Sequence, residues 1–220
     1  MASSGFCVLN TVAVAAAYAR HHEEEWRAPR IAIVDIDIHH GNGTEEIVRN
    51  LTPHMTHLPL PSSWAPMQTL SYKPWLSDAD ADEVFFSSVH LYAGTVCTQQ
   101  TTPTSSSVEH IVNIALTPIG PGPWDRKARA KLTPAQRDVL CKQASQEFRT
   151  KITTMLIPRI TTFNADLIFI SAGFDAHYDD MYHFLTEDDI HWVTDELCRV
   201  ARQSGGSRGC GVISVLEGGY

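Results

Sequence analysis

The feature that most constrains the fold is the stretch IAIVDIDIHHGNG at residues 31–43. Its apolar start has the composition of a strand buried on both faces, and we expect a strand over residues 30–40. Asp35, Asp37 and His39 follow at intervals of two, which places their side chains on one face of such a strand. The glycines after them end the strand, so the three polar groups lie at its carboxyl end.

Two interpretations of these three polar residues are open. Asp35 and His39 can cap a turn while Asp37 pairs with a basic group. Alternatively, the three side chains bind a cation, because several carboxylates in an apolar strand are costly to bury without a charge that neutralises them. Open α/β sheets also place their ligand sites at the carboxyl ends of strands. We therefore favour the cation site.

Composition limits the classes of protein to which the chain can belong. Its 220 residues fit one domain with a sizeable core, and no apolar run is long enough to span a membrane. The net charge of −8 provides no basic field, so we expect no direct binding to nucleic acid or to a membrane. The five cysteines are scattered without a CxxC pair, which predicts reduced thiols in the nucleus or the cytoplasm.

Hydrophobic periodicity predicts alternating helices and strands along the chain. We expect helices at residues 10–20, 44–50, 133–156 and 186–204, and further strands at residues 83–92, 111–116, 166–175 and 211–216. Pro158 should end or kink the third helix. Such alternation indicates a three-layer α/β/α fold with a mainly parallel central sheet.

One segment interrupts this alternation. Residues 51–82 contain five prolines and too little periodic apolar pattern to form a core of their own. We therefore predict a Pro-rich, irregular insertion within a single domain that spans residues 1–220.

Three of the predicted strands end in unusual polar groups. Besides residues 35–39, Asp175 ends the strand at residues 166–175, and the sequence EGGY follows the last strand at residues 217–220. If these strands lie in one parallel sheet, the groups converge on one crevice. Two carboxylates and one histidine suit a divalent cation such as zinc and leave a coordination position for water or substrate. Tyr220, beside two glycines, is placed to donate a hydrogen bond to a developing oxyanion.

These motifs resemble those of the zinc-dependent histone deacetylases. The similarity rests on DIDIHHGNG at residues 35–43, SAGFD at 171–175, LEGGY at 216–220 and, near the start, GFCVLN at 5–10. Asn42 and the LEGGY sequence are closer to class II of the family. The resemblance covers nearly the whole chain and implies the arginase/deacetylase fold, incomplete at both ends.

The resemblance implies a metal centre with identified ligands. Asp37, His39 and Asp175 match the residues that bind Zn²⁺ in the family. Asp35 matches the acid that orients a catalytic histidine, and it also matches a ligand of a buried monovalent-cation site for K⁺. Ser88 is a further candidate ligand of that K⁺ site.

The resemblance also implies a reaction and a substrate site. Tyr220 matches the tyrosine that polarises the scissile carbonyl, and Gly5, Phe6 and Gly219 match walls of the tunnel for the acylated lysine. The implied reaction is hydrolysis of N-acetyl-lysine on histones or other proteins, in the nucleus or the cytoplasm. Chromatin and transcription regulation, with a corepressor-type complex as partner, follow from the same resemblance.

The sequence departs from the family pattern at its start. In the family, the paired histidines that include the general base precede the GFC segment, and this chain has only four residues before Gly5. We therefore expect a partial histone deacetylase catalytic domain that needs upstream residues for activity.

Two other functions fit the same residues. A non-catalytic zinc-binding scaffold or regulatory protein would not need the general base, and an acetylpolyamine-type amidohydrolase shares the metal site. A binuclear manganese ureohydrolase fits less well, because it needs more bridging carboxylates than Asp175 alone supplies at the end of its strand.

Overall fold

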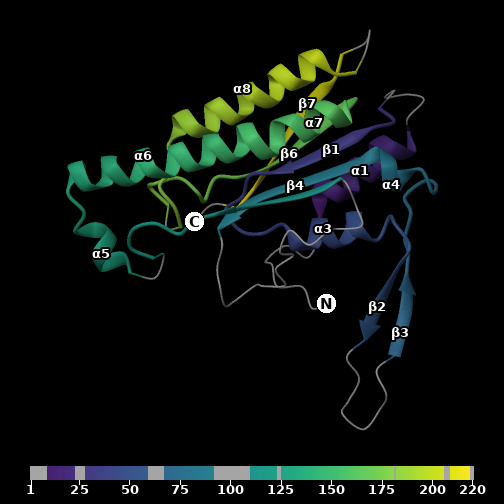
Figure 1. The fold of residues 1–220 in the computed structure, drawn as a ribbon, viewed down its shortest axis with the longest axis horizontal. Coiled ribbons are helices and arrows are strands. Elements are labelled where there is room, and N and C mark those ends of the chain that lie inside the picture. The colour runs from purple at the N-terminus through teal and green to yellow at the C-terminus, as the bar shows by residue number, and fades with distance from the viewer. Residues whose placement is uncertain are drawn as a thin grey trace.

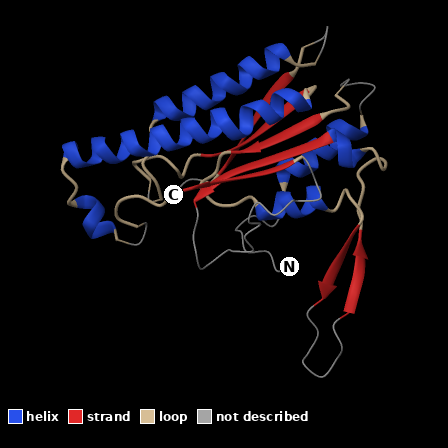
Figure 2. Ribbon diagram, in the orientation of Figure 1, coloured by secondary structure: helices blue, strands red, loops and turns tan. Residues whose placement is uncertain are grey.

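A parallel sheet forms the centre of the molecule. The computed structural model describes residues 9–22, 28–58, 67–91, 110–122, 125–180, 182–205 and 209–218. Five strands pair in the order β5-β4-β1-β6-β7, and every pairing between them is parallel (Figures 1 and 2). They are β1 (Ile31–Asp35), β4 (Val84–Leu91), β5 (Ile111–Leu116), β6 (Leu167–Gly173) and β7 (Gly211–Glu217).

The middle strands of the sheet are buried on both faces. Every residue of β1 and of β6 is buried, as their continuous runs of Ile, Val, Ala and Phe lead one to expect for parallel strands covered by helices. Within β1 the side chains alternate between two cores, with Ala32 and Val34 in one and Ile31 and Ile33 in the other.

Two helices cover one face of the sheet. α1 (Thr11–His21) begins where the Asn10 side chain accepts a hydrogen bond of 2.8 Å from the backbone N–H of Ala13. α3 (Asn42–Arg49) follows β1 directly, and the two helices share a core with Ile31 and Ile33.

Longer helices cover the opposite face (Figure 1). α6 (Pro134–Lys151) and α7 (Ile157–Phe163) form one continuous helical run, and α8 (Glu187–Gln203) packs beside them. Phe148 is a buried member of this second core. The three-layer α/β/α arrangement predicted from the sequence is therefore confirmed.

The third helix does not end at Pro158, one of the two predicted outcomes, because helical structure continues to Phe163. A π-helical segment at Ile152–Leu156 lies immediately before α7. Pro158 occupies the first turn of α7, where a missing N–H is tolerated. The wider π turn thus allows helical structure to continue past the proline.

The prediction that residues 51–82 are irregular is wrong for much of the segment. β2 (His54–Leu58) pairs antiparallel with β3 (Met67–Ser71), and α4 (Asp80–Glu83) ends the excursion. Figure 2 shows this two-stranded ribbon standing away from the main sheet. Pro53 and Pro74 flank the ribbon, so these prolines delimit the strands and do not exclude them.

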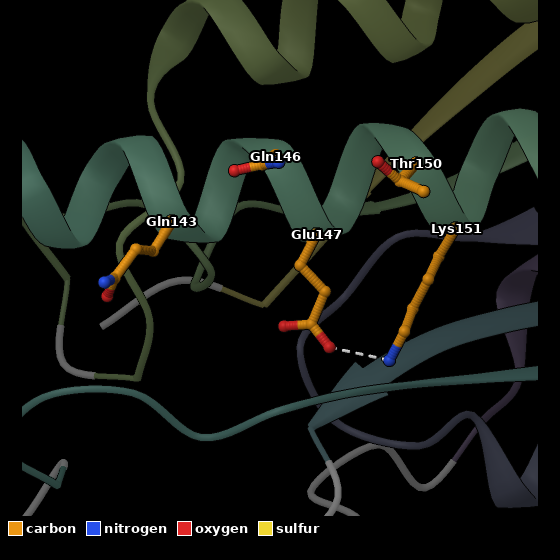
Figure 3. A pocket seen from close by; sticks show the side chains of 5 residues that line it. All are labelled: Gln143, Gln146, Glu147, Thr150 and Lys151. Atoms are coloured by element: carbon orange, nitrogen blue, oxygen red, sulfur yellow. Dashed lines mark hydrogen bonds and ion pairs between the residues drawn. The ribbon is translucent and has the colours of Figure 1, made fainter.

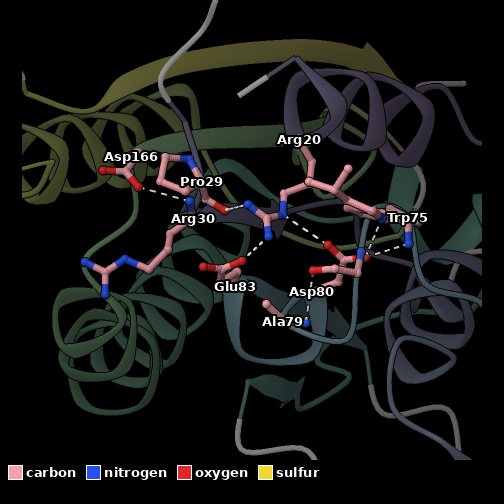
Figure 4. Close-up of polar contacts among 10 residues, drawn as sticks. Arg20, Pro29, Arg30, Trp75, Ala79, Asp80, Glu83 and Asp166 are labelled. Carbon is pink, nitrogen blue, oxygen red and sulfur yellow. Dashed lines mark hydrogen bonds and ion pairs between the residues drawn. The ribbon is translucent and has the colours of Figure 1, made fainter. Parts of the chain in front are cut away.

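A buried ion pair attaches this excursion to α1 (Figure 4). Arg20 is 3% exposed and Asp80 is fully buried, and the Arg20 Nε lies 3.1 Å from Asp80 Oδ1. Asp80 Oδ2 also accepts backbone N–H bonds of 2.6 and 2.7 Å from Trp75 and Leu76. A second nitrogen of Arg20 donates to the carbonyl of Pro29 at 2.9 Å, so the same guanidinium also holds the segment before β1.

The remaining short helix is α5 (Arg126–Ala130), which leads towards α6. Within the described part of the chain, no helix is both long and apolar enough to cross a membrane.

Candidate metal centre

The strand that organises the sequence ends earlier than predicted, because side-chain oxygens take over from the ladder of backbone bonds. β1 stops at Asp35, not at residue 40. Asp35 Oδ1 accepts the backbone N–H of Asp37 at 3.0 Å, and Asp37 Oδ1 accepts the N–H of His39 at 2.6 Å. Such Asx turns bend the chain out of the strand.

Asp175 completes the cluster from the loop after β6. It is fully buried, and its Oδ1 accepts the backbone N–H of Ile38 at 3.0 Å. This bond draws the loop after β1 against the end of β6. The His39 Nδ1 consequently lies 3.0 Å from Asp37 Oδ1 and 2.7 Å from Asp175 Oδ2.

The structure therefore brings Asp37, His39 and Asp175 together at the carboxyl edge of the sheet. One ligand atom from each residue lies within 4.8 Å of the other two. Within the part of the chain that is described, this is the one group of three or more histidine, cysteine or acidic side chains with such spacing. Asp175 is buried, Asp37 is 17% exposed and His39 is 47% exposed. One side of the cluster is therefore accessible to solvent, and the other lies in the protein interior.

The electrostatics of the cluster favour a positive charge. Contacts of the imidazole with Asp175, and then with Asp37, raise the pKa of His39 to about 10. Burial, followed by repulsion from Asp37, raises the pKa of Asp35 well above its ordinary value. The carboxylates of the site thus carry more negative charge than the single imidazole of His39 can neutralise.

Glycines allow the backbone to approach these carboxylates closely. At Gly173 an added Cβ would overlap the Asp37 side chain, with Cβ and Cγ both at 2.7 Å. Gly218 has a positive φ of 34°, and a Cβ there would lie 2.5 Å from Asp37 Oδ2 and 3.9 Å from Asp175 Oδ2. β6 and the residue after β7 therefore form two walls of the site.

The residues present fit a divalent cation. The Asp175 Oδ2 is buried but accepts no hydrogen bond among the described residues, because its short contact with His39 lacks hydrogen-bond geometry. A buried carboxylate oxygen without a hydrogen bond is stabilised by a cation in contact with it, and either the imidazolium of His39 or a metal ion supplies that charge. Two carboxylates and an imidazole are ligands of zinc, and around a tetrahedral ion such atoms lie roughly 3.3 Å apart, close to the 3.0 and 2.7 Å between His39 Nδ1 and the two carboxylates.

Asp35 and Ser88, predicted to share a monovalent-cation site, lie side by side on β1 and β4. Both are buried. The Ser88 Oγ accepts the backbone N–H of Gly41 at 3.2 Å and lies 3.1 Å from His90 Nδ1. The structure thus places the two residues together.

The other predicted site residues fall outside the described part of the chain. They are Gly5, Phe6, Gly219 and Tyr220.

Tyr182 is a member of the site that sequence reasoning missed. Its ring packs edge-on against the His39 ring, with centroids 4.4 Å apart. Burial, and then the charge of Asp175, raise the pKa of Tyr182. No pattern in the sequence indicated this contact, because Tyr182 lies in an irregular loop.

Beside the site, α3 begins at Asn42, two residues before the helix that the sequence predicts at residues 44–50. Thr44 therefore lies inside α3, and it accepts a hydrogen bond of 2.7 Å from Asn10. His40 is half-buried, and its Nε2 lies 2.6 Å from Glu45 Oε2.

A groove of about 320 Å³ lies elsewhere, on one side of α6 (Figure 3). Its walls are polar side chains of that single helix, including Glu147 and Lys151, which form an ion pair of 2.6 Å. None of the predicted site residues lines this groove.

Comparisons with known proteins give the same family as the sequence motifs. A family model described as the histone deacetylase domain matches residues 1–220. Type-2 histone deacetylase 2 of Dictyostelium discoideum is 30% identical over 223 residues, which cover 99% of this chain and 10% of that protein. Polyamine deacetylase HDAC10 of Mus musculus is 28% identical over 222 residues, covering 100% of this chain and 25% of that protein.

Solved structures agree with the fold. The HD domain of HDA15 matches 99% of this chain and 46% of that chain, with a TM-score of 0.60 and 23% identity. The histone deacetylase Clr3 matches 97% of this chain and 27% of that chain, with a TM-score of 0.57 and 21% identity. The chain spans 10% to 50% of the length of the curated relatives that it matches. Because the family model covers the whole sequence, the chain belongs to the histone deacetylase domain family.

Proposed function

We propose that this chain is part of a zinc-dependent deacetylase domain that hydrolyses N-acetyl-lysine. The observation that supports the proposal most directly is the cluster of Asp37, His39 and Asp175, whose ligand atoms lie within 4.8 Å of one another. Family membership supports deacetylation, and the donor set supports zinc.

Each residue of the cluster has a distinct task in this proposal. The partly exposed Asp37 and His39 and the buried Asp175 would each supply one ligand atom to the metal. When bound, zinc acts as a Lewis acid on the amide carbonyl and lowers the pKa of water. Asp35 lies beneath the cluster and fixes Asp37 through its backbone N–H.

The proposed substrate rests on membership of the histone deacetylase domain family. Acetylated lysine in histones or other proteins suits a histone deacetylase domain, and the nucleus or the cytoplasm is the corresponding location. In this proposal Tyr220 polarises the acetyl carbonyl, Gly5, Phe6 and Gly219 line the acyl-lysine tunnel, and K⁺ binds beside Asp35 and Ser88. Corepressor-type assembly remains part of the same proposal.

A second substrate class has a specific observation in its favour. The mouse and human relatives named polyamine deacetylase HDAC10 match the whole chain at 28% and 25% identity. An acetylated polyamine carries the same amide on a flexible cationic chain, so it can reach the same metal site. The assay therefore includes both substrates.

The test is hydrolysis of an acetyl-lysine peptide and of an N-acetylated polyamine by this chain and by a version extended upstream with its native coding sequence. Asp175→Asn retains an oxygen for the Ile38 N–H but loses the charge that the metal needs, so it should abolish activity. Asp179→Asn, an exposed carboxylate in the following loop, is the matched control and should retain it. Zinc binding without hydrolysis of either substrate by either version would support the scaffold alternative instead.

A further inference from the structure

Glu217 ends β7 and directs its carboxylate towards the centre of the sheet. Its partner in register on β6 is Gly173, which has no side chain to block the way. The Glu217 carboxylate therefore reaches diagonally to Ser171, two residues earlier on β6, and accepts a hydrogen bond from its hydroxyl. Ser171 is 3% exposed, so this bond is made inside the protein.

A second contact attaches Glu217 to α1. Its other oxygen accepts a hydrogen bond of 3.4 Å from Thr11 Oγ1, at the start of α1. The carboxylate of Glu217 thus links three elements: β7, the neighbouring strand β6 and helix α1.

These contacts lead directly to the metal cluster. The carbonyl of Ser171 accepts the backbone N–H of Ile36 at 3.0 Å, and Ile36 lies between Asp35 and Asp37. On the other side, the residue after Glu217 is Gly218, which packs against Asp37 Oδ2 and whose carbonyl accepts the Phe174 N–H at 3.3 Å. Glu217 therefore fixes two backbone segments that contact Asp37.

We propose that Glu217 is a positioning residue for the metal centre, which holds the end of β7 at the distance from Asp37 and Asp175 that metal binding requires. This inference rests on the proposed function, because it assumes that the cluster binds a divalent cation. Its effect is geometric: the carboxylate acts by accepting hydrogen bonds, and it does not contact the ligand atoms. Partners that orient metal ligands typically change affinity about 10- to 100-fold when they are removed.

The test is titration of the metal-free chain with Co²⁺, followed by its visible absorption, which reports both affinity and coordination geometry. Glu217→Ala should weaken binding about 10- to 100-fold and change the shape of the spectrum. Glu217→Gln keeps an oxygen that accepts the Ser171 hydrogen bond, so it should bind within about threefold of the wild type. Glu196→Ala, which removes a glutamate from an exposed pair on α8, is the matched control and should behave as the wild type.

The outcomes separate this inference from the proposed function. Normal binding by Glu217→Ala, or equal loss in Glu217→Gln and Glu217→Ala, would overturn the positioning role while the metal centre stands. A wild-type chain that does not bind Co²⁺ would overturn both. Thermal unfolding of each metal-free variant distinguishes a displaced β7 from a chain that fails to fold, and Ser171→Ala should reproduce the effect of Glu217→Ala from the other end of the hydrogen bond.

Discussion

At the scale of single residues, the absence of a side chain at Gly173 is as important as the ligands themselves. A Cβ at this position would overlap Asp37. Gly173→Ala should therefore displace Asp37, weaken Zn²⁺ binding about 10- to 100-fold and destabilise the fold by roughly 1–3 kcal/mol. Metal titration and urea unfolding measure the two effects.

The control for that substitution is Gly43→Ala. A Cβ at Gly43 meets nothing within 4 Å, and the residue lies inside α3, where alanine is preferred to glycine. Gly43→Ala should leave metal binding unchanged and stabilise the chain slightly. Equal effects of the two substitutions would contradict the close packing of Gly173 against Asp37.

The buried side chain of His183 should make the stability of the protein depend on pH. Its side chain is fully buried, and neither ring nitrogen has a hydrogen-bond partner among the described residues. Burial lowers the pKa of His183 to about 4, whereas the unfolded chain titrates at about 6.5. Between pH 6.5 and 4, His183 binds a proton in the unfolded chain but stays neutral in the folded chain. The free energy of unfolding therefore falls as the pH is lowered through this range.

At pH 5, the low pKa of His183 should reduce the free energy of unfolding by about 2 kcal/mol. Urea unfolding at pH 7.5 and 5, compared between the metal-free wild type and His183→Phe, isolates it. The phenylalanine variant should lose less stability on acidification. An identical pH dependence in the two proteins would mean that His183 is not held neutral by burial.

At the scale of elements, the Arg20–Asp80 ion pair holds the excursion at residues 51–82 against α1. Asp80 is one of the two carboxylates that pair with the buried Arg20, and Glu83 is the other. We expect Asp80→Ala to lower the free energy of unfolding by about 3 kcal/mol, because Arg20 loses its buried partner and the N–H groups of Trp75 and Leu76 lose their acceptor. Arg199→Ala, which breaks an exposed pair on α8, should change it little; comparable losses in urea unfolding would argue against this role.

The elements also show what the sequence could and could not predict. The apolar runs of β1 and β6 identified their strands, because burial on both faces leaves a continuous pattern. The end of β1 could not be predicted from alternation, since the N–H groups of Asp37 and His39 bond to side chains. The β2–β3 ribbon could not be predicted, because the prolines on either side of its strands favour an irregular segment.

The residues of the candidate site also fall into those that the sequence predicts and those that it does not. Residues 35–39 and Asp175 were predicted to meet because parallel strands bring their carboxyl ends together, and the resemblance to the histone deacetylases identified Asp37, His39 and Asp175 among them as the ligands. Tyr182 and the bridge formed by Glu217 depend on packing between segments far apart in the sequence, which no local pattern encodes.

At the scale of the whole molecule, the metal should stabilise the fold. The ligands come from loops after β1 and β6, so binding joins segments that unfolding separates. At a free zinc concentration about 100 times Kd, the free energy of unfolding should rise by about 2.7 kcal/mol. This corresponds to an increase in Tm of roughly 5–10 °C for a chain of this size, measured by thermal unfolding with zinc or with a chelator.

The same experiment has a clear negative outcome. Asp175→Asn should unfold at the same temperature with zinc and with the chelator. A zinc-dependent increase of equal size in the variant would place the bound zinc elsewhere on the protein.

The zinc content of the purified chain after dialysis, determined for the wild type, Asp175→Asn and Asp179→Asn, tests whether the cluster binds a metal. We expect about one zinc per chain in the wild type and in Asp179→Asn, and none in Asp175→Asn, because one such cluster supplies the protein ligands of one tetrahedral zinc. Equal zinc in all three proteins, or none in the wild type, would contradict a metal centre formed by Asp37, His39 and Asp175.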